Sequence, residues 1–282
     1  MKRRPALTVA LIHAALALAC VVSLYPVLWV VKLALSPTQS LSLSVNPFPE
    51  HVTLDHFRDV LLSSDTQGRW LFGRQLLASI VVSGATTIVG LSLAVTAAYA
   101  LSRFRFPGKQ EGMQALLVTQ MFPATLMLVP LYSILQKLSL LDSLGGLVLV
   151  YATSSLPFCV WMLKGYFDTI PRELEEAAIM DGASPGQVFV KIVLPLATPA
   201  LAVTALFSFM QAWNEFILAA TLLNDTTRFT LPVALQRYVG EYKTEWGHFA
   251  AGALIVSAPV IALFFALQKY LVGGLTAGAV KG

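Results

Sequence analysis

The chain has 282 residues, of which 56% are hydrophobic and only 12% are charged, and its formal net charge is +4. A soluble domain carries about 25% charged residues, so this composition excludes a soluble protein and predicts an integral membrane protein. The basic residues are scattered at the ends of apolar runs, which excludes a nucleic-acid-binding surface as the reason for the positive charge.

Six apolar segments are long enough to cross a bilayer, because a spanning helix needs about 20 residues. Helices are expected rather than strands, since every backbone polar group must be satisfied within the segment. The expected spans are 9–35, 76–101, 113–136, 144–163, 196–223 and 249–271. Together with a polar hairpin at 168–195, they predict an all-α integral membrane fold of six transmembrane helices in one domain, 1–282.

The N-terminus has two interpretations. Lys2-Arg3-Arg4 before an apolar run resembles a secretion signal, and Leu18-Ala19-Cys20 resembles a lipoprotein cleavage site. The apolar run continues to Leu35, whereas a signal core has about 7–15 residues, so an uncleaved first span is favoured over lipoprotein processing. Cys20 and Cys159 lack metal-ligand spacing and are interpreted as packing residues.

Orientation follows from the basic residues that flank the spans. The dense clusters Lys2–Arg4 and Arg103–Lys109 fall on the same side, which is therefore predicted to be cytoplasmic, with both termini. The chain is expected to be a multi-pass protein of the cell (inner) membrane.

Two long loops, 36–75 and 224–248, then face outward. Phe229, Tyr238 and Tyr242 in the second loop are candidate contacts for an extracytoplasmic partner, while Trp246 fits a lipid-interface anchor equally well.

Polar side chains inside the spans are the next candidates. Thr204, Ser208, Gln211 and Glu215 share one helix face, Asn214 lies beside them, and Gln120 precedes a proline kink in the third span. They are interpreted as lining a pathway or a subunit interface. The alternatives are a proton or cation site at Glu215, hydrogen bonds between helices worth about 1 kcal/mol or less, and a Glu215 that reaches the outer interface.

Motifs for catalysis or nucleotide binding are not found. The chain has no Walker motif, no HExxH, no GxSxG and no His/Cys cluster. We therefore expect a protein that is not an enzyme and binds neither metal nor cofactor. An ion gradient or another subunit must supply the energy for any transport.

The hairpin at 168–195 has its own start and stop signals. Acidic residues from Glu173 to Glu176 favour a helix start, and Gly182 can adopt the left-handed conformation that ends this helix. Ser184-Pro185-Gly186-Gln187 fits a capped second helix, which Pro195 is expected to end. Because the first helix is acidic, anionic lipid would repel it, and docking into a groove of another protein is favoured.

The same stretch carries a family resemblance. EEAAIMDGASPGQVFVKIVLPLATP resembles the EAA loop of binding-protein-dependent ABC importer permeases. The wider chain resembles the six-span second permease of maltose-type importers, through RFPGK (105–109), QMFP (120–123), KGYF (164–167) and the tail GLTAGAVKG. The positions that match the EAA pattern are Glu176, Ala177, Ala178, Asp181, Gly182, Ala183, Phe189, Ile192, Leu194, Pro195 and Pro199.

The resemblance implies a type I ABC importer permease that moves an oligosaccharide, such as maltose, maltodextrin or another α-glucoside. It implies as partners a second permease, an ATP-binding subunit dimer that holds ATP and Mg, and an extracytoplasmic sugar-binding protein, besides membrane lipid and without nucleic acid. The residues expected to couple to the ATPase are Glu175, Glu176, Ala177, Ala178, Asp181, Gly182 and Ala183.

The resemblance also assigns roles to other regions. The loop 224–248 would reach into the binding protein, the tail 273–282 would approach the ATPase dimer, and the sugar site would lie mainly in the partner permease. Three alternatives stay open: a stand-alone ion-coupled transporter using Glu215, an ABC permease for a different solute, and a non-transporting scaffold.

Overall fold

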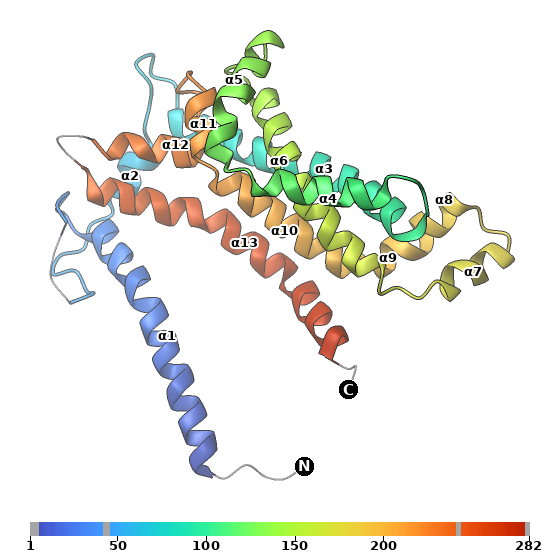
Figure 1. Ribbon diagram of the computed structural model, residues 1–282. Coiled ribbons are helices and arrows are strands. Elements are labelled where there is room, and N and C mark those ends of the chain that lie inside the picture. Colours follow the sequence, from blue (N-terminus) through green and yellow to red (C-terminus); the bar gives the residue numbers. More distant parts are fainter. Residues whose placement is uncertain (1–5, 42–45, 241–243, 280–282) are drawn as a thin grey trace. The chain divides into compact units, whose positions relative to one another are not determined.

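The computed structural model describes residues 6–41, 46–240 and 244–279, and across these ranges the chain is almost wholly helical, with isolated β-bridges but no strand (Figure 1). The elements in chain order are α1 (Ala6–Leu35), α2 (Asp55–Leu61), α3 (Leu71–Arg103), α4 (Lys109–Met121), η1 (Ala124–Met127), α5 (Leu128–Lys137), α6 (Leu144–Phe167), α7 (Glu173–Met180), α8 (Pro185–Val188), η2 (Phe189–Val193), α9 (Leu194–Leu196), α10 (Thr198–Asn214), α11 (Ile217–Leu222), α12 (Leu231–Leu235), η3 (Gln236–Tyr238) and α13 (Trp246–Ala279).

The chain forms two compact units. The first comprises residues 1–73 and 235–258, and the second comprises residues 74–234 and 259–282. In the first unit, Leu33 and Ala34 at the end of α1 pack against Ala250 and Ala251 near the start of α13. The rest of α1 exposes its apolar side chains, with Leu7 72% exposed, as expected of a helix whose surroundings are lipid.

The second unit is built on α6, which packs against α10 and α4. One buried cluster joins α3, the C-terminal half of α6 and the hairpin, through residues such as Ala98, Phe167 and Val193. A second cluster joins α6, α10 and α11 through residues such as Tyr151 and Ala212. Small residues let α3 approach α6 closely: a Cβ on Gly90 would lie 3.1 Å from Ser155 Oγ.

Two of the expected spans are not continuous helices. The segment 113–136 is divided between α4 and α5, which are bent by 94° about an extended Phe122-Pro123 pair. The proline ring lacks an N–H and excludes the preceding residue from helical geometry, which explains the break.

The segment 196–223 is also broken. Helix α10 ends at Asn214, and α11 begins only at Ile217. Glu215, just before the N-cap residue Phe216, accepts the N–H groups of Leu218 and Ala219 with its carboxylate and so satisfies the first turn of a new helix.

Pro195 does not end the second helix of the hairpin, contrary to expectation. The helix passes through a π-helical stretch, η2, and continues to Leu196, after which the chain bends by 74° into α10. The wider π turn relieves the clash between a proline ring and the preceding turn, so the helix can include Pro195.

Four described helices are long and apolar enough to cross a membrane: Leu7–Leu35, Leu71–Arg103, Leu144–Phe167 and Trp246–Tyr270. Counting each bent pair as one span, Lys109–Met121 with Thr125–Lys137 and Pro185–Leu196 with Thr198–Asn214, brings the number to as many as six.

Candidate functional site

The polar hairpin between α6 and α10 is the first candidate site (yellow in Figure 1). Helix α7 carries three acidic residues in its first turn and ends at Met180, with Asp181 as its C-cap and Gly182 following at a φ of +87°. Ser184 then caps α8 in a complete capping box with Gln187, which confirms the predicted start. The left-handed glycine and the capping box together define the turn between the two helices.

A nearly buried ion pair ties this hairpin to α3. Arg103 Nε lies 2.5 Å from Glu175 Oε1, and the two side chains are only 7% and 11% exposed. The hydroxyl of Tyr99 donates to the other carboxylate oxygen at 2.9 Å, and Arg103 Nη2 donates to the carbonyl of Ile170 at 3.0 Å. Glu175 therefore faces inward and holds α7 against the end of α3.

A second connection lies at the end of α6. Asp168 accepts from Ser102 Oγ and from Lys164 Nζ, each at 2.6 Å. Burial acts to raise the pKa of Asp168, but the hydrogen bonds from Lys164 and Ser102 outweigh it and, with the charges of Lys164 and Arg103, hold this pKa below its usual range. Arg172 Nη2 adds a bond to the carbonyl of Ser102 at 3.2 Å.

The outer face of α7 is open to solvent. Glu176, Ala177, Asp181 and Gly182 are exposed, whereas Ala178 and Ala183 pack partly against the core cluster of α6. Leu174, Ile179 and Met180 also reach solvent, with Met180 88% exposed. An acidic helix with an apolar rim suits a protein groove.

The polar residues of the fifth apolar segment differ in how far they are buried. Thr204 and Ser208 are fully buried, and their hydroxyls have no hydrogen-bond partner. Gln211 and Asn214 are exposed, and Asn214 Nδ2 donates to the carbonyl of Met210 on its own helix.

Glu215 is occupied by local hydrogen bonds. Its carboxylate accepts from the hydroxyl of Tyr151 and from the backbone N–H groups of Leu218 and Ala219, at 2.8 and 3.1 Å. Through these bonds the side chain joins α6, α10 and α11, which is its observed role.

Three cavities meet at Gln211. The largest, about 550 Å³, lies among α4, α6 and α10 and includes Gln120. A second of about 100 Å³ extends inward to Thr86, Ser208 and Glu215, and a third of about 360 Å³ includes Asn214. Of the predicted pathway residues only Thr204 lines none of them.

The predicted binding-protein contacts are held in different ways. Phe229 packs partly against the second core cluster of the second unit, and Tyr242 lies outside the described residues. Tyr238 belongs to the first unit, where its ring lies 5.4 Å from that of His248 and its hydroxyl accepts from Arg237 Nη2 at 2.7 Å.

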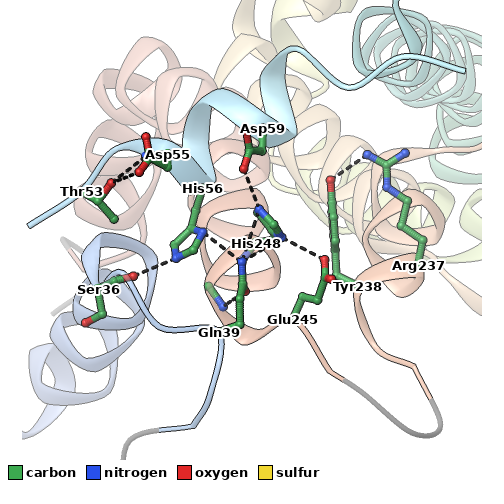
Figure 2. A network of polar contacts seen from close by, with 11 residues as sticks. Ser36, Gln39, Thr53, Asp55, His56, Asp59, Arg237, Tyr238, Glu245 and His248 are labelled. Atoms are coloured by element: carbon green, nitrogen blue, oxygen red, sulfur yellow. Dashed lines mark hydrogen bonds and ion pairs between the residues drawn. The ribbon is translucent and has the colours of Figure 1, made fainter.

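Figure 2 shows a polar network in the first unit that sequence patterns do not indicate. His248 lies 3.1 Å from Asp59 Oδ2 and 2.9 Å from Glu245 Oε2, one carboxylate at each ring nitrogen. Gln39 Oε1 accepts from the N–H of Gly247 at 3.1 Å, and His56 Nε2 lies 2.7 Å from the carbonyl of Ser36. Gln39 and His248 are 209 positions apart, so local spacing contains no signal for this contact.

Comparison with known proteins identifies the class. Residues 90–276 match the family described as "Binding-protein-dependent transport system inner membrane component", and the chain belongs to that family. It is thus a multi-pass membrane permease subunit of an ABC importer and not an enzyme, which confirms the class inferred from the EAA pattern.

Curated relatives match nearly the whole chain. The trehalose transport system permease protein SugB of Mycobacterium tuberculosis (strain CDC 1551 / Oshkosh) is 38% identical over 262 residues, covering 92% of this chain and 93% of SugB. The maltose/maltodextrin transport system permease protein MalG of Escherichia coli (strain K12) is 38% identical over 288 residues, covering 96% of this chain and 95% of MalG.

Solved structures share the fold. A chain of a bacterial ABC transporter involved in the import of the acidic polysaccharide alginate matches with a TM-score of 0.77 at 24% identity, covering 96% of this chain and 99% of that one. A chain of the MetNI methionine ABC transporter matches with a TM-score of 0.61 at 17% identity, covering 74% and 99%. These likenesses confirm the predicted all-α membrane fold.

Proposed function

We propose that the chain is a permease subunit of an ATP-driven importer for an oligosaccharide built on α-linked glucose, such as maltose, maltodextrin or trehalose. The observation that carries this proposal is the 38% identity, over more than nine tenths of the chain, to permeases named for trehalose and for maltose transport. The chain would form half of the translocation pathway, and a second permease subunit would form the other half.

The hairpin is proposed to couple the permease to a separate ATPase. Its outer face, with Glu176, Ala177, Asp181 and Gly182, would dock in a groove of the ATP-binding subunit, where ATP and Mg are held. The ion pair between Glu175 and Arg103 supports this role, since an anchored helix transmits a displacement to α3 and α6 without slipping. Ala178 and Ala183 would keep α7 packed on the membrane helices.

The remaining assignments concern the two sides of the membrane. We infer that both termini and the hairpin are cytoplasmic, and that the loop 224–248 faces an extracytoplasmic sugar-binding protein. Phe229, Tyr238 and Tyr242 remain the proposed contacts in that loop, and the tail 273–282 is proposed to approach the ATPase dimer.

The test is reconstitution. The chain, its second permease and its ATPase are purified together, placed in proteoliposomes and supplied with the binding protein. Uptake of radiolabelled maltose or trehalose should require ATP and survive an uncoupler. Uptake by this chain alone, abolished by the uncoupler, would instead establish the ion-coupled alternative. A complex that hydrolyses ATP but moves neither sugar would establish an ABC permease for another solute.

A further inference from the structure

We propose that the cavity among α4, α6 and α10 is a contact site on this chain for the hydroxyl groups of a neutral sugar. The inference rests on the proposed sugar transport and assigns part of the sugar's recognition to this subunit. Its key residues are Gln120 and Gln211, whose side chains line the cavity from two different helices.

The size of the cavity suits a sugar. Its volume of about 550 Å³ lies within the range of about 300–1,000 Å³ that small-molecule sites occupy. The inner cavity of about 100 Å³ is too small for a disaccharide, but it has room for several waters at about 10–15 Å³ each. Gln211 and Ser154 line both spaces, so they lie between a sugar-sized volume and a water-sized one.

The polar groups in these spaces need partners. Gln120 Nε2 donates one of its two N–H groups to the carbonyl of Ser154 at 3.2 Å. The second N–H and the amide oxygen of Gln120 do not take part in this bond. In the inner cavity, the buried hydroxyls of Thr86 and Ser208 have no hydrogen-bond partner. Because an unpaired polar group away from water costs about 1–3 kcal/mol, these positions favour a hydrated, hydroxyl-rich occupant over lipid.

The chemistry of the lining selects a neutral solute. The described residues around the large cavity contribute amides and hydroxyls, and none of them is ionisable. Glu215, in the inner cavity, is already bonded to Tyr151 and to the N-terminus of α11. Phe122 and Pro157 add apolar walls, which fit the C–H faces of a sugar ring. An amino acid or a phosphate would find no counter-charge among these side chains.

The experiment uses the complete transporter in proteoliposomes with its binding protein and radiolabelled maltose or trehalose. The variants are Gln211→Leu and Gln120→Leu, and the matched control is Gln114→Leu, an exposed glutamine of α4 that lines none of the three cavities. We expect sugar uptake by each cavity variant to fall roughly tenfold, while the subunits still co-purify and the binding protein still stimulates ATP hydrolysis. The control should transport normally.

Deoxy sugars provide the second readout. If Gln211 binds one sugar hydroxyl, the difference between wild type and Gln211→Leu should disappear for the analogue that lacks that hydroxyl. Normal uptake by both cavity variants would overturn the proposal. The proposal would also be overturned if the second permease no longer co-purified with the cavity variants, since the cavity would then be a subunit interface. A wild-type transporter that moves neither sugar would refute the proposed function itself, which distinguishes the two failures.

Discussion

The carboxylate of Glu175 lies 2.5 Å from the guanidinium of Arg103, and the side chains are only 11% and 7% exposed. One residue belongs to the polar hairpin and the other to the last turn of α3. Arginine is the residue best suited to such a buried pair, because its planar guanidinium can donate two hydrogen bonds to one carboxylate. The pair therefore fixes the position of α7 relative to α3.

Breaking this pair should loosen the hairpin. We expect Arg103→Ala to lower the free energy of unfolding by on the order of 3 kcal/mol, because it leaves the Glu175 carboxylate buried without its counter-charge. ATP hydrolysis in the assembled transporter should continue with little sugar uptake. Thermal unfolding of the purified complex and uptake assays measure the two effects.

The control for this prediction is Glu173→Gln, which removes an exposed acid from the same helix. It should lower the midpoint of unfolding far less than Arg103→Ala does, because it removes only a favourable charge at the helix start. Equal stability of the Arg103→Ala variant and the wild type would show that the pair does not hold the hairpin.

Sequence patterns predicted the local features of this site but not its long-range contacts. Gly182 and the capping box of Ser184 and Gln187 were predictable because the signals lie within a few residues of one another. The sequence places Glu175 among the residues expected to couple to the ATPase, because its partner Arg103 is 72 positions away and leaves no local signal. A 3.6-residue period shows which residues share a face but not which face is buried.

The breaks in two apolar segments show a second limit. Hydropathy over 196–223 is continuous, and Glu215 reads as a polar residue within a span. Its carboxylate accepts two backbone N–H groups instead and starts a new helix. Local propensity does not reveal the bond between the same carboxylate and Tyr151, which is 64 positions away. The break at Pro123 had a visible signal in the proline, but its angle did not.

Asp168 predicts a pH dependence. Its pKa is held below the usual range, so its contribution to stability is present at neutral pH and is lost as pH falls through that depressed value. Asp168→Asn should therefore be less stable than wild type at pH 7. The difference should shrink below about pH 4, the ordinary pKa of an aspartate. Thermal unfolding of both proteins across this range tests the prediction, and a constant difference would contradict it.

Gly182 should tolerate only residues that accept a positive φ. No heavy atom lies within 4 Å of a Cβ built at this position, so a substitution acts through backbone strain and not through a clash. A β-branched side chain at φ +87° is strained by about 1–2 kcal/mol. We expect Gly182→Val to abolish ATP-driven uptake while the protein remains in the membrane, and Gly182→Asn to retain most of it.

The matched control for Gly182 is Gly186→Ala. Gly186 lies in the first turn of α8, where an alanine suits the helix. This variant should transport normally, as measured by uptake and by membrane quantification. Full activity of Gly182→Val would show that the shape of this turn is irrelevant to coupling.

Gln39 should stabilise the first turn of α13. Its Oε1 accepts from the N–H groups of Gly247 and His248, at 3.1 and 3.4 Å, which is the role of a helix cap (Figure 2). Gln39→Met keeps the volume and removes the acceptor, so we expect a loss of about 1 kcal/mol. Hydrogen exchange should become faster at Gly247 and His248 and stay unchanged in α6. Unchanged protection at both amides would rule out the cap.

Glu215 separates the ATP-driven mechanism from an ion-coupled one. Glu215→Gln keeps an acceptor for the N–H of Leu218 and a partner for Tyr151, so ATP-driven uptake should stay within about twofold of wild type.

Glu215→Leu removes both the acceptor for Leu218 and the partner of Tyr151. The buried Tyr151 hydroxyl then lacks a partner, which lowers stability by about 1–3 kcal/mol. Asn214→Leu is the neighbouring comparison, because Asn214 Nδ2 donates to the carbonyl of Met210 on its own helix. Uptake assays with an uncoupler, together with thermal unfolding, distinguish a structural role of Glu215 from a role in ion coupling. A Gln variant that is stable but does not transport would indicate that the charge of Glu215 acts in translocation.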